Sequence, residues 1–175
     1  MSERSASTIA DGPALGWTLA VARVTVAFMW MSGSGWKVPP DFGENSGRGL
    51  FKYVSYGVDY PVLAPYAWVA ENLILPNLQV FGWLTLLTEA SLGAFLLVGL
   101  ATRFWAAVGI VQSVTIALSV LFAPHEWPWS YYLMVLAHVV LLVSAAGRVH
   151  GLDGVFRDRW QGSEHPLARL MWRVS

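Results

Sequence analysis

One stretch, LQVFGWLTLLTEASLGAFLLVGLATR from Leu78 to Arg103, constrains the fold of this chain more than any other. About 20 consecutive apolar residues are needed for a helix to cross the roughly 30 Å hydrocarbon layer of a bilayer, and this stretch is long enough. Its only acid, Glu89, lies near the middle. A carboxylate at that depth is costly in lipid, so it faces protein or water. We therefore expect a membrane-spanning helix with a polar partner inside a bundle.

The composition indicates an integral membrane protein. Hydrophobic residues make up 55% of the chain and charged residues only 13%, whereas soluble domains contain about 25% charged residues. The formal net charge is zero, and no basic block suggests a nucleic-acid partner. The chain has no cysteine, which excludes disulfides, thiolate redox chemistry and iron–sulfur clusters held by its own thiolates.

Three further apolar stretches approach the length of a span, and proline or glycine closes each of them: Leu15–Ser34, Phe104–Phe122 and Trp129–Ala146. None shows the alternating pattern of a barrel strand. The predicted fold is all-α, an integral membrane four-helix bundle. It forms one domain over 15–147, preceded by a flexible N-terminus (1–14) and followed by an amphipathic tail (148–175).

The connection between the first two spans, Gly35–Asn77, is long for a helical bundle. Its second half, from Leu50 onward, is apolar and rich in tyrosine and tryptophan, which favour the membrane interface. We expect one or two short helices here, lying over the outer mouth of the bundle.

The distribution of basic residues predicts that both termini are cytoplasmic, in the plasma or bacterial inner membrane. With this orientation the inner side holds Arg4, Arg103, Arg148, Arg157, Arg159, Arg169 and Arg173, and the outer side holds Lys37, Arg48 and Lys52. Lys37 is expected to extend to the headgroups, or else to bind an anion that enters from outside.

Each of the four predicted spans carries one strong polar group at a similar depth: Arg23, Glu89, Gln112 and His138. Opposite charges in a low-dielectric interior must pair or become neutral, so Arg23 and Glu89 are predicted to form an ion pair. In the functional interpretation, Glu89 and His138 exchange protons with a redox ligand while Arg23 orients its carbonyl group. In the alternative interpretation, these groups only fix the register of the bundle, with Gln112 and His138 bonded between helices. No metal site is predicted.

Three segments resemble the DoxX/DoxD family of four-helix membrane proteins. These segments are LAVARVTVAFMWMSGSGWK with Arg23, TEASLGAFLLVGLATRFWA with Glu89, and SAAGRVHGLDG with Asp153. The long outer connection and the Trp127-Pro128-Trp129 turn are closer to the DoxD type, the small subunit of thiosulfate:quinone oxidoreductase.

The resemblance implies a membrane subunit of a quinone-linked oxidoreductase. A quinone is then the candidate cofactor, and a second oxidoreductase subunit or a larger membrane complex is the candidate partner. Glu89, Arg23 and His138 would act on the ligand, and Gln112 would help them to bind the quinone headgroup or a small oxyanion. Whether this chain itself catalyses a reaction is left open. The alternative is a non-catalytic anchor or assembly subunit for a redox complex.

Overall fold

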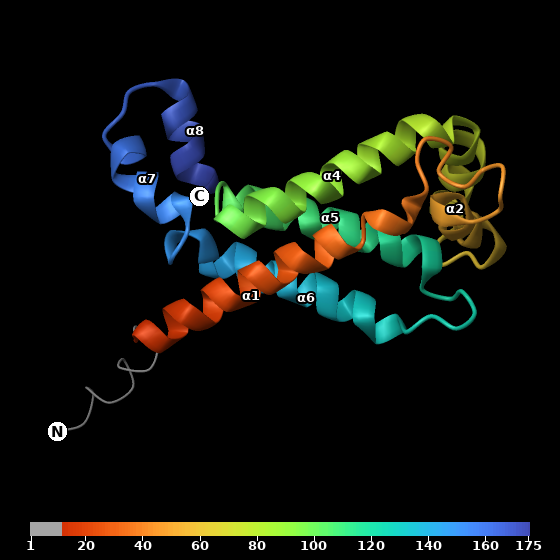
Figure 1. The fold of residues 1–175 in the computed structure, drawn as a ribbon, viewed down its shortest axis with the longest axis horizontal. Helices are drawn as coiled ribbons and strands as arrows, with labels where there is room; N and C mark the ends of the chain where they lie inside the picture. The colour runs from red at the N-terminus through yellow and green to blue at the C-terminus, as the bar shows by residue number, and fades with distance from the viewer. Residues whose placement is uncertain (1–11) are drawn as a thin grey trace.

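The computed structural model describes residues 12–175. The predicted flexible N-terminus, 1–14, lies almost wholly outside this described part. Within it the fold is all-α, without strands. The long helices run side by side along the molecule (Figure 1). They are α1 (Pro13–Ser32), α4 (Leu78–Val98), α5 (Thr102–Val120) and α6 (Pro128–Ser144).

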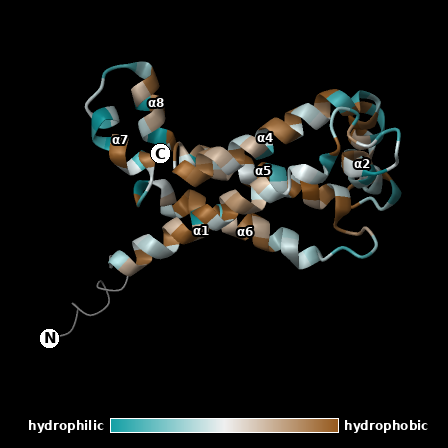
Figure 2. Ribbon diagram, viewed as in Figure 1, coloured by the Kyte–Doolittle hydropathy of each residue, from teal (hydrophilic) through white to brown (hydrophobic). Residues whose placement is uncertain are grey.

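Three helical segments of the described chain are long and apolar enough to cross a membrane: Pro13–Lys37, Ala64–Val98 and Thr102–Val120. The fourth predicted span is present as the shorter apolar helix α6, of 17 residues. Figure 2 shows hydrophobic residues along all of these helices. Large apolar side chains in mid-helix are exposed, including Val111 of α5 and Leu136 of α6, as expected for a bundle surrounded by lipid.

The bundle has a continuous apolar core between its helices. Buried residues of α1 and α4, such as Ala27, Trp30, Leu92 and Leu96, pack against Leu141 of α6 and neighbouring residues of α5. Gly99, with φ +68°, ends α4 in the left-handed conformation, and α5 begins three residues later. This tight turn makes α4 and α5 an antiparallel pair, as predicted.

The long connection contains the expected short helices. They are α2 (Gly49–Asp59) and α3 (Ala64–Val69), which is followed by a π-helical turn η2 (Ala70–Ile74) and a 3-10 turn η3 (Leu75–Asn77). Pro76 was predicted to separate this region from the second span. Helical turns instead link α3 to α4 throughout, and Pro76 lies within the 3-10 turn η3.

A small satellite core fixes these helices on the bundle. Phe42, Leu50, Val54, Ala70 and Leu78 are buried together, and a Cβ at Gly82 of α4 would lie 2.5 Å from the Phe42 ring. Close by, backbone and side-chain hydrogen bonds from Gly43 and Asn45 to the Asp41 carboxylate lower the pKa of that group. We call the end of the bundle that carries α2, α3 and the 121–127 loop the loop end.

The opposite end, which we call the tail end, carries the α4–α5 turn and two further helices, α7 (Leu152–Gln161) and α8 (Pro166–Val174). Asp153 joins the tail to the bundle. Its buried carboxylate accepts hydrogen bonds from the backbone N–H groups of Ala101 (2.7 Å) and Thr102 (2.9 Å), and its own N–H donates to the Gly99 carbonyl. The first turn of α5 is therefore capped by a residue distant in the sequence.

Candidate ligand-binding site

A cavity of about 720 Å³ lies in the half of the bundle nearest the loop end. Side chains of α1, α4, α5 and α6 form its walls, and residues of α2 and α3 line it at the loop end. Most of the lining is apolar, but one group of polar side chains faces the same space: Lys37, Glu89, Gln112 and His138. Such a cavity, mainly apolar with a few convergent polar groups, is the usual form of a small-molecule site.

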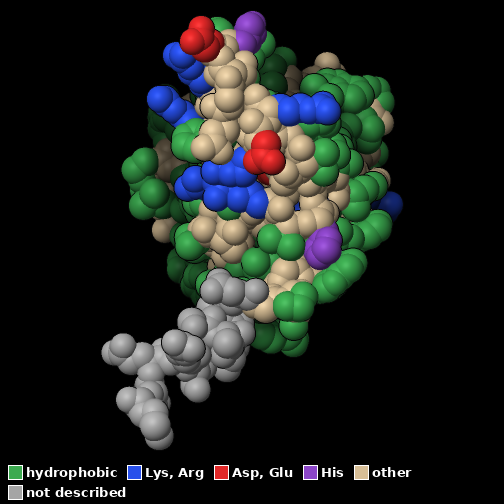
Figure 3. All heavy atoms as spheres, turned by 90° about the vertical axis from the view of Figure 1, so that its left-hand side faces the viewer, with side chains coloured by type: hydrophobic (Ala, Val, Ile, Leu, Met, Phe, Trp, Pro, Cys, Tyr) green, Lys and Arg blue, Asp and Glu red, His purple; other side chains and the backbone are tan. Residues whose placement is uncertain are grey.

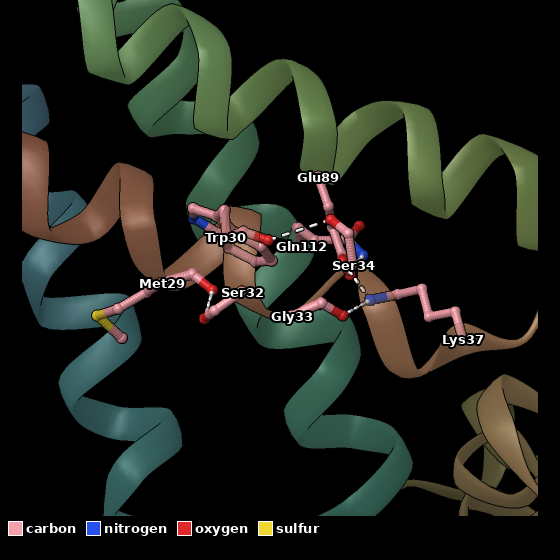
Figure 4. Close-up of polar contacts among 8 residues, drawn as sticks. All are labelled: Met29, Trp30, Ser32, Gly33, Ser34, Lys37, Glu89 and Gln112. Atoms are coloured by element: carbon pink, nitrogen blue, oxygen red, sulfur yellow. Dashed lines mark hydrogen bonds and ion pairs between the residues drawn. The ribbon is translucent and has the colours of Figure 1, made fainter.

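Lys37 reaches this cavity from the last turn of the first helical segment, Pro13–Lys37. Helix α1 ends at Ser32, and the 3-10 turn η1 (Gly35–Lys37) follows at once. The ammonium group donates one hydrogen bond to the Gly33 carbonyl (2.6 Å) and another to the Glu89 carboxylate. Figure 4 shows both contacts, with the lysine side chain directed from η1 toward α4. Lys37 is only 2% exposed, so the prediction that it extends to the headgroups is wrong.

Glu89 comes from the middle of α4 and is 3% exposed. Its carboxylate pairs with Lys37, and its second oxygen lies 3.5 Å from the side-chain nitrogen of Gln112 on α5. Two charges taken out of water must be compensated by each other and by hydrogen bonds. The site therefore contains a buried ion pair with an amide at its edge, contributed by three separate elements.

Arg23 does not pair with Glu89, and that prediction is wrong. Its guanidinium donates instead to the backbone carbonyls of Leu96 and Leu97 (2.8 Å) at the end of α4, and to that of His150 (3.0 Å). The last carbonyls of a helix have no partner within the helix, and Arg23 satisfies two of them. It acts as a clamp at the tail end and does not line the cavity.

The direction of the Cα–Cβ bonds explains why Glu89 pairs with Lys37 and not with Arg23. Side chains tilt toward the N-terminus of their own helix. In α1 that end is the tail end, so Arg23 leans away from Glu89. In α4 the N-terminus is at the loop end, so Glu89 leans toward η1, where Lys37 leans back into the bundle. Arg23 and Glu89 were predicted to lie at a similar depth in the membrane, but similar depth did not predict contact between their side chains.

His138 of α6 is held between helices. Trp30 Nε1 of α1 donates to His138 Nε2 (2.9 Å), and His138 Nδ1 lies 2.7 Å from the Met134 carbonyl. The two contacts require a proton on Nδ1 and none on Nε2, which is a neutral imidazole. Gly109 of α5 allows this arrangement, because a Cβ there would lie 2.1 Å from the ring. The hydrogen-bonded packing considered from the sequence is therefore present, and the predicted proton-exchange role stays a prediction.

The cavity thus brings together three of the four residues that were predicted to bind a ligand, namely Glu89, Gln112 and His138, and excludes Arg23. Sequence reasoning did not identify Lys37 as the partner of Glu89, or Trp30 as the partner of His138. One available signal was the closeness of Lys37 to the predicted end of the first span at Ser34, because a helical continuation of three residues carries the lysine with that span.

The part of the chain that the structure describes contains no group of three or more side chains able to hold a metal ion. Compared with known proteins, residues 17–171 match a family model described as "TQO small subunit DoxD". No curated protein and no solved structure matches the chain.

Proposed function

Because the chain belongs to the DoxD family, we propose that it is the small membrane subunit of a thiosulfate:quinone oxidoreductase and binds a quinone headgroup beside Lys37 and Glu89. The membrane-length apolar helices make it a multi-pass membrane protein. A bound quinone would supply the electron-accepting chemistry, in which two electrons and two protons convert it to a quinol.

The observation that carries this proposal is the buried Lys37–Glu89 pair, with Gln112 beside it, in a mainly apolar cavity. A quinone ring presents carbonyl oxygens, which accept hydrogen bonds, on a flat apolar body. Lys37 has three N–H donors, and Gly33 and Glu89 use two of them. The remaining N–H of Lys37 and the amide of Gln112 can donate to a carbonyl oxygen. Glu89, when protonated, can deliver a proton to the same oxygen.

The apolar walls of the cavity fit a lipid-soluble ligand. Leu84 of α4 and Met29 of α1 line the cavity, yet they are also 55% and 49% exposed on the outer surface of the bundle. The lining is therefore continuous with the surface that faces lipid. A quinone could enter sideways from the bilayer, with its apolar tail remaining among the exposed side chains.

The partner in this proposal is a larger subunit that oxidises the sulfur substrate. The description of the family refers to a small subunit, which supports the proposal of a larger partner, and the sequence of this chain has no cysteine to carry sulfur. We assign electron donation to the partner and quinone binding and protonation to the helical bundle. With the predicted four spans and both termini inside, the cavity would lie in the outer half of the membrane. The arginine-rich tail end (Figure 3) supports this orientation.

Quinone binding can be measured directly with the purified chain and a short-chain ubiquinone analogue, using quenching of the tryptophan fluorescence. Trp30 and Trp36 line the cavity and report on it. We expect Lys37→Met and Glu89→Gln each to weaken binding about tenfold, equivalent to one charge-assisted hydrogen bond. Glu71→Gln is the matched control, because this glutamate is exposed and does not line the cavity.

Wild-type affinity in both cavity variants would refute the site. Absence of quinone binding in the wild type, together with co-purification of a larger subunit in mild detergent, would instead support the anchor or assembly role. Quinol formation with thiosulfate in the co-expressed complex then tests the activity. We expect it to fall in the same two variants and to persist in the Glu71 control.

A further inference from the structure

The tail end carries an amphipathic helix whose apolar side is uncovered. Helix α8 has Leu167, Leu170, Met171 and Val174 on one side, at helical spacing, and Arg169 and Arg173 beside them. Leu167 is 65% exposed and Leu170 is 54% exposed. Two leucines left in solvent do not stabilise a nine-residue helix, so this side needs a partner, which residues 12–175 do not supply.

The orientation of α8 differs from that of the bundle. Figure 1 shows it running across the long axis shared by α1, α4, α5 and α6. It contacts α7 and α5, so it lies against the end of the bundle. If the bundle crosses the bilayer, a helix placed across its end lies parallel to the membrane surface. This is the position in which an amphipathic helix can embed one side at the headgroup level.

The charge of the tail complements an anionic surface. From residue 148 onward the basic residues are Arg148, Arg157, Arg159, Arg169 and Arg173, and the acids are Asp153, Asp158 and Glu164. Asp153 is fully buried in the cap of α5 and presents no charge to the outside. Figure 3 shows several Lys and Arg side chains and fewer acidic ones on this face. Arginine clusters next to a membrane-spanning helix bind anionic headgroups.

The contact between α7 and α8 keeps the basic groups on this face. The Arg157 guanidinium of α7 lies 5.1 Å from the centre of the Trp172 ring of α8. Trp172 and the leucines lie on different sides of α8, so its packing on α7 leaves Leu167 and Leu170 free. Helices α7 and α8 therefore pack together and leave Leu167 and Leu170 exposed, with Arg169 and Arg173 beside them.

We propose that α8 is an interfacial anchor that inserts Leu167 and Leu170 among anionic phospholipids while Arg169 and Arg173 bind the lipid phosphates. The anchor would hold the tail end, and through Asp153 the α4–α5 turn, at a fixed depth in the membrane. This inference needs neither quinone binding nor oxidoreductase activity.

Because the chain has no cysteine, a spin label can be attached to a single introduced cysteine. A spin label is attached to Leu170→Cys, and to Gln161→Cys as an exposed polar control in α7. Each protein is placed in nanodiscs of phosphatidylcholine alone, or of an equimolar mixture with phosphatidylglycerol. Collision rates with oxygen, which concentrates in lipid, and with a water-soluble nickel complex report the depth of the label.

In the mixed lipid we expect the label at position 170 to collide mainly with oxygen, and the label at 161 mainly with nickel. In phosphatidylcholine alone, position 170 should shift toward nickel. Arg169→Gln with Arg173→Gln should reduce the lipid preference of the same label about tenfold. These two arginines are exposed and outside the cavity, so the fold is retained.

Two results would overturn the proposal. Equal nickel access at positions 161 and 170 in both lipids would show a helix in water. A label at position 170 that neither reagent reaches would show a protein partner on this surface instead of lipid.

Discussion

The ammonium group of Lys37 lies against the carboxylate of Glu89 inside the bundle, although 52 positions of the chain separate them. Helices α2 and α3 lie between them in the sequence and pack at the loop end. The contact therefore joins the end of the first span to the middle of the next one, and it depends on the folding of the whole connection between them.

Breaking this pair from one side should destabilise the protein more than removing both charges. Lys37→Met or Glu89→Gln alone leaves a buried group without its partner, which costs about 3–5 kcal/mol. The double variant should lose clearly less free energy of unfolding than the sum of the losses in the two single variants. Thermal unfolding of the wild type, the two single variants and the double variant, each purified in detergent, measures these losses. Lys52→Met, which removes an exposed lysine, is the control. Strict additivity would contradict a direct interaction.

Replacing Arg23 by lysine should loosen the tail end even though the positive charge is kept. A single ammonium group cannot reach the carbonyls of Leu96, Leu97 and His150 together, so at least one charged hydrogen bond is lost, worth about 1.5–3 kcal/mol. Hydrogen exchange should increase at the end of α4 and around residue 150. Arg48→Lys, at an exposed site of the loop end, should leave exchange unchanged. Unaltered protection in the Arg23 variant would argue against the clamp.

Asp153→Asn should weaken the cap of α5. The amide keeps one acceptor oxygen but presents a donor to the second backbone N–H, so the group at Ala101 or Thr102 is left unpaired, at a cost of about 1–3 kcal/mol. We expect a lower unfolding temperature and earlier proteolysis of the tail after residue 148. Asp158→Asn, in the exposed part of α7, serves as the comparison and should behave as wild type.

Gly109→Ala should separate α5 from α6 and disturb the Trp30–His138 hydrogen bond. The added Cβ would lie 2.1 Å from the imidazole ring, and relieving such a clash costs about 1–3 kcal/mol. The fluorescence of the tryptophans should change together with the loss of stability. Gly35→Ala is the matched control, since a Cβ at that position meets no atom within 4 Å. An equal effect in both variants would mean that the close approach at Gly109 is unimportant.

The sequence alone determined the class of the protein and most of its helices. Apolar stretches of sufficient length indicated the long helices, and their ends agree with the structure within a few residues. The aromatic second half of the long connection predicted the short helices now seen as α2 and α3. These features are local, because hydrophobic length, proline and glycine act within a single segment.

Only the tertiary structure decided which cation meets Glu89. The sequence required a partner for the buried acid, and Arg23 was the only Lys or Arg in the interior of a predicted span. The selection of Lys37 depends on the helical continuation of the first segment past Ser32 to Lys37 and on the tilt of each side chain toward the start of its own helix. Antiparallel neighbours tilt in opposite directions, so Arg23 points to the tail end, and the pair forms near the loop end, where Lys37 of η1 and Glu89 of α4 tilt toward each other.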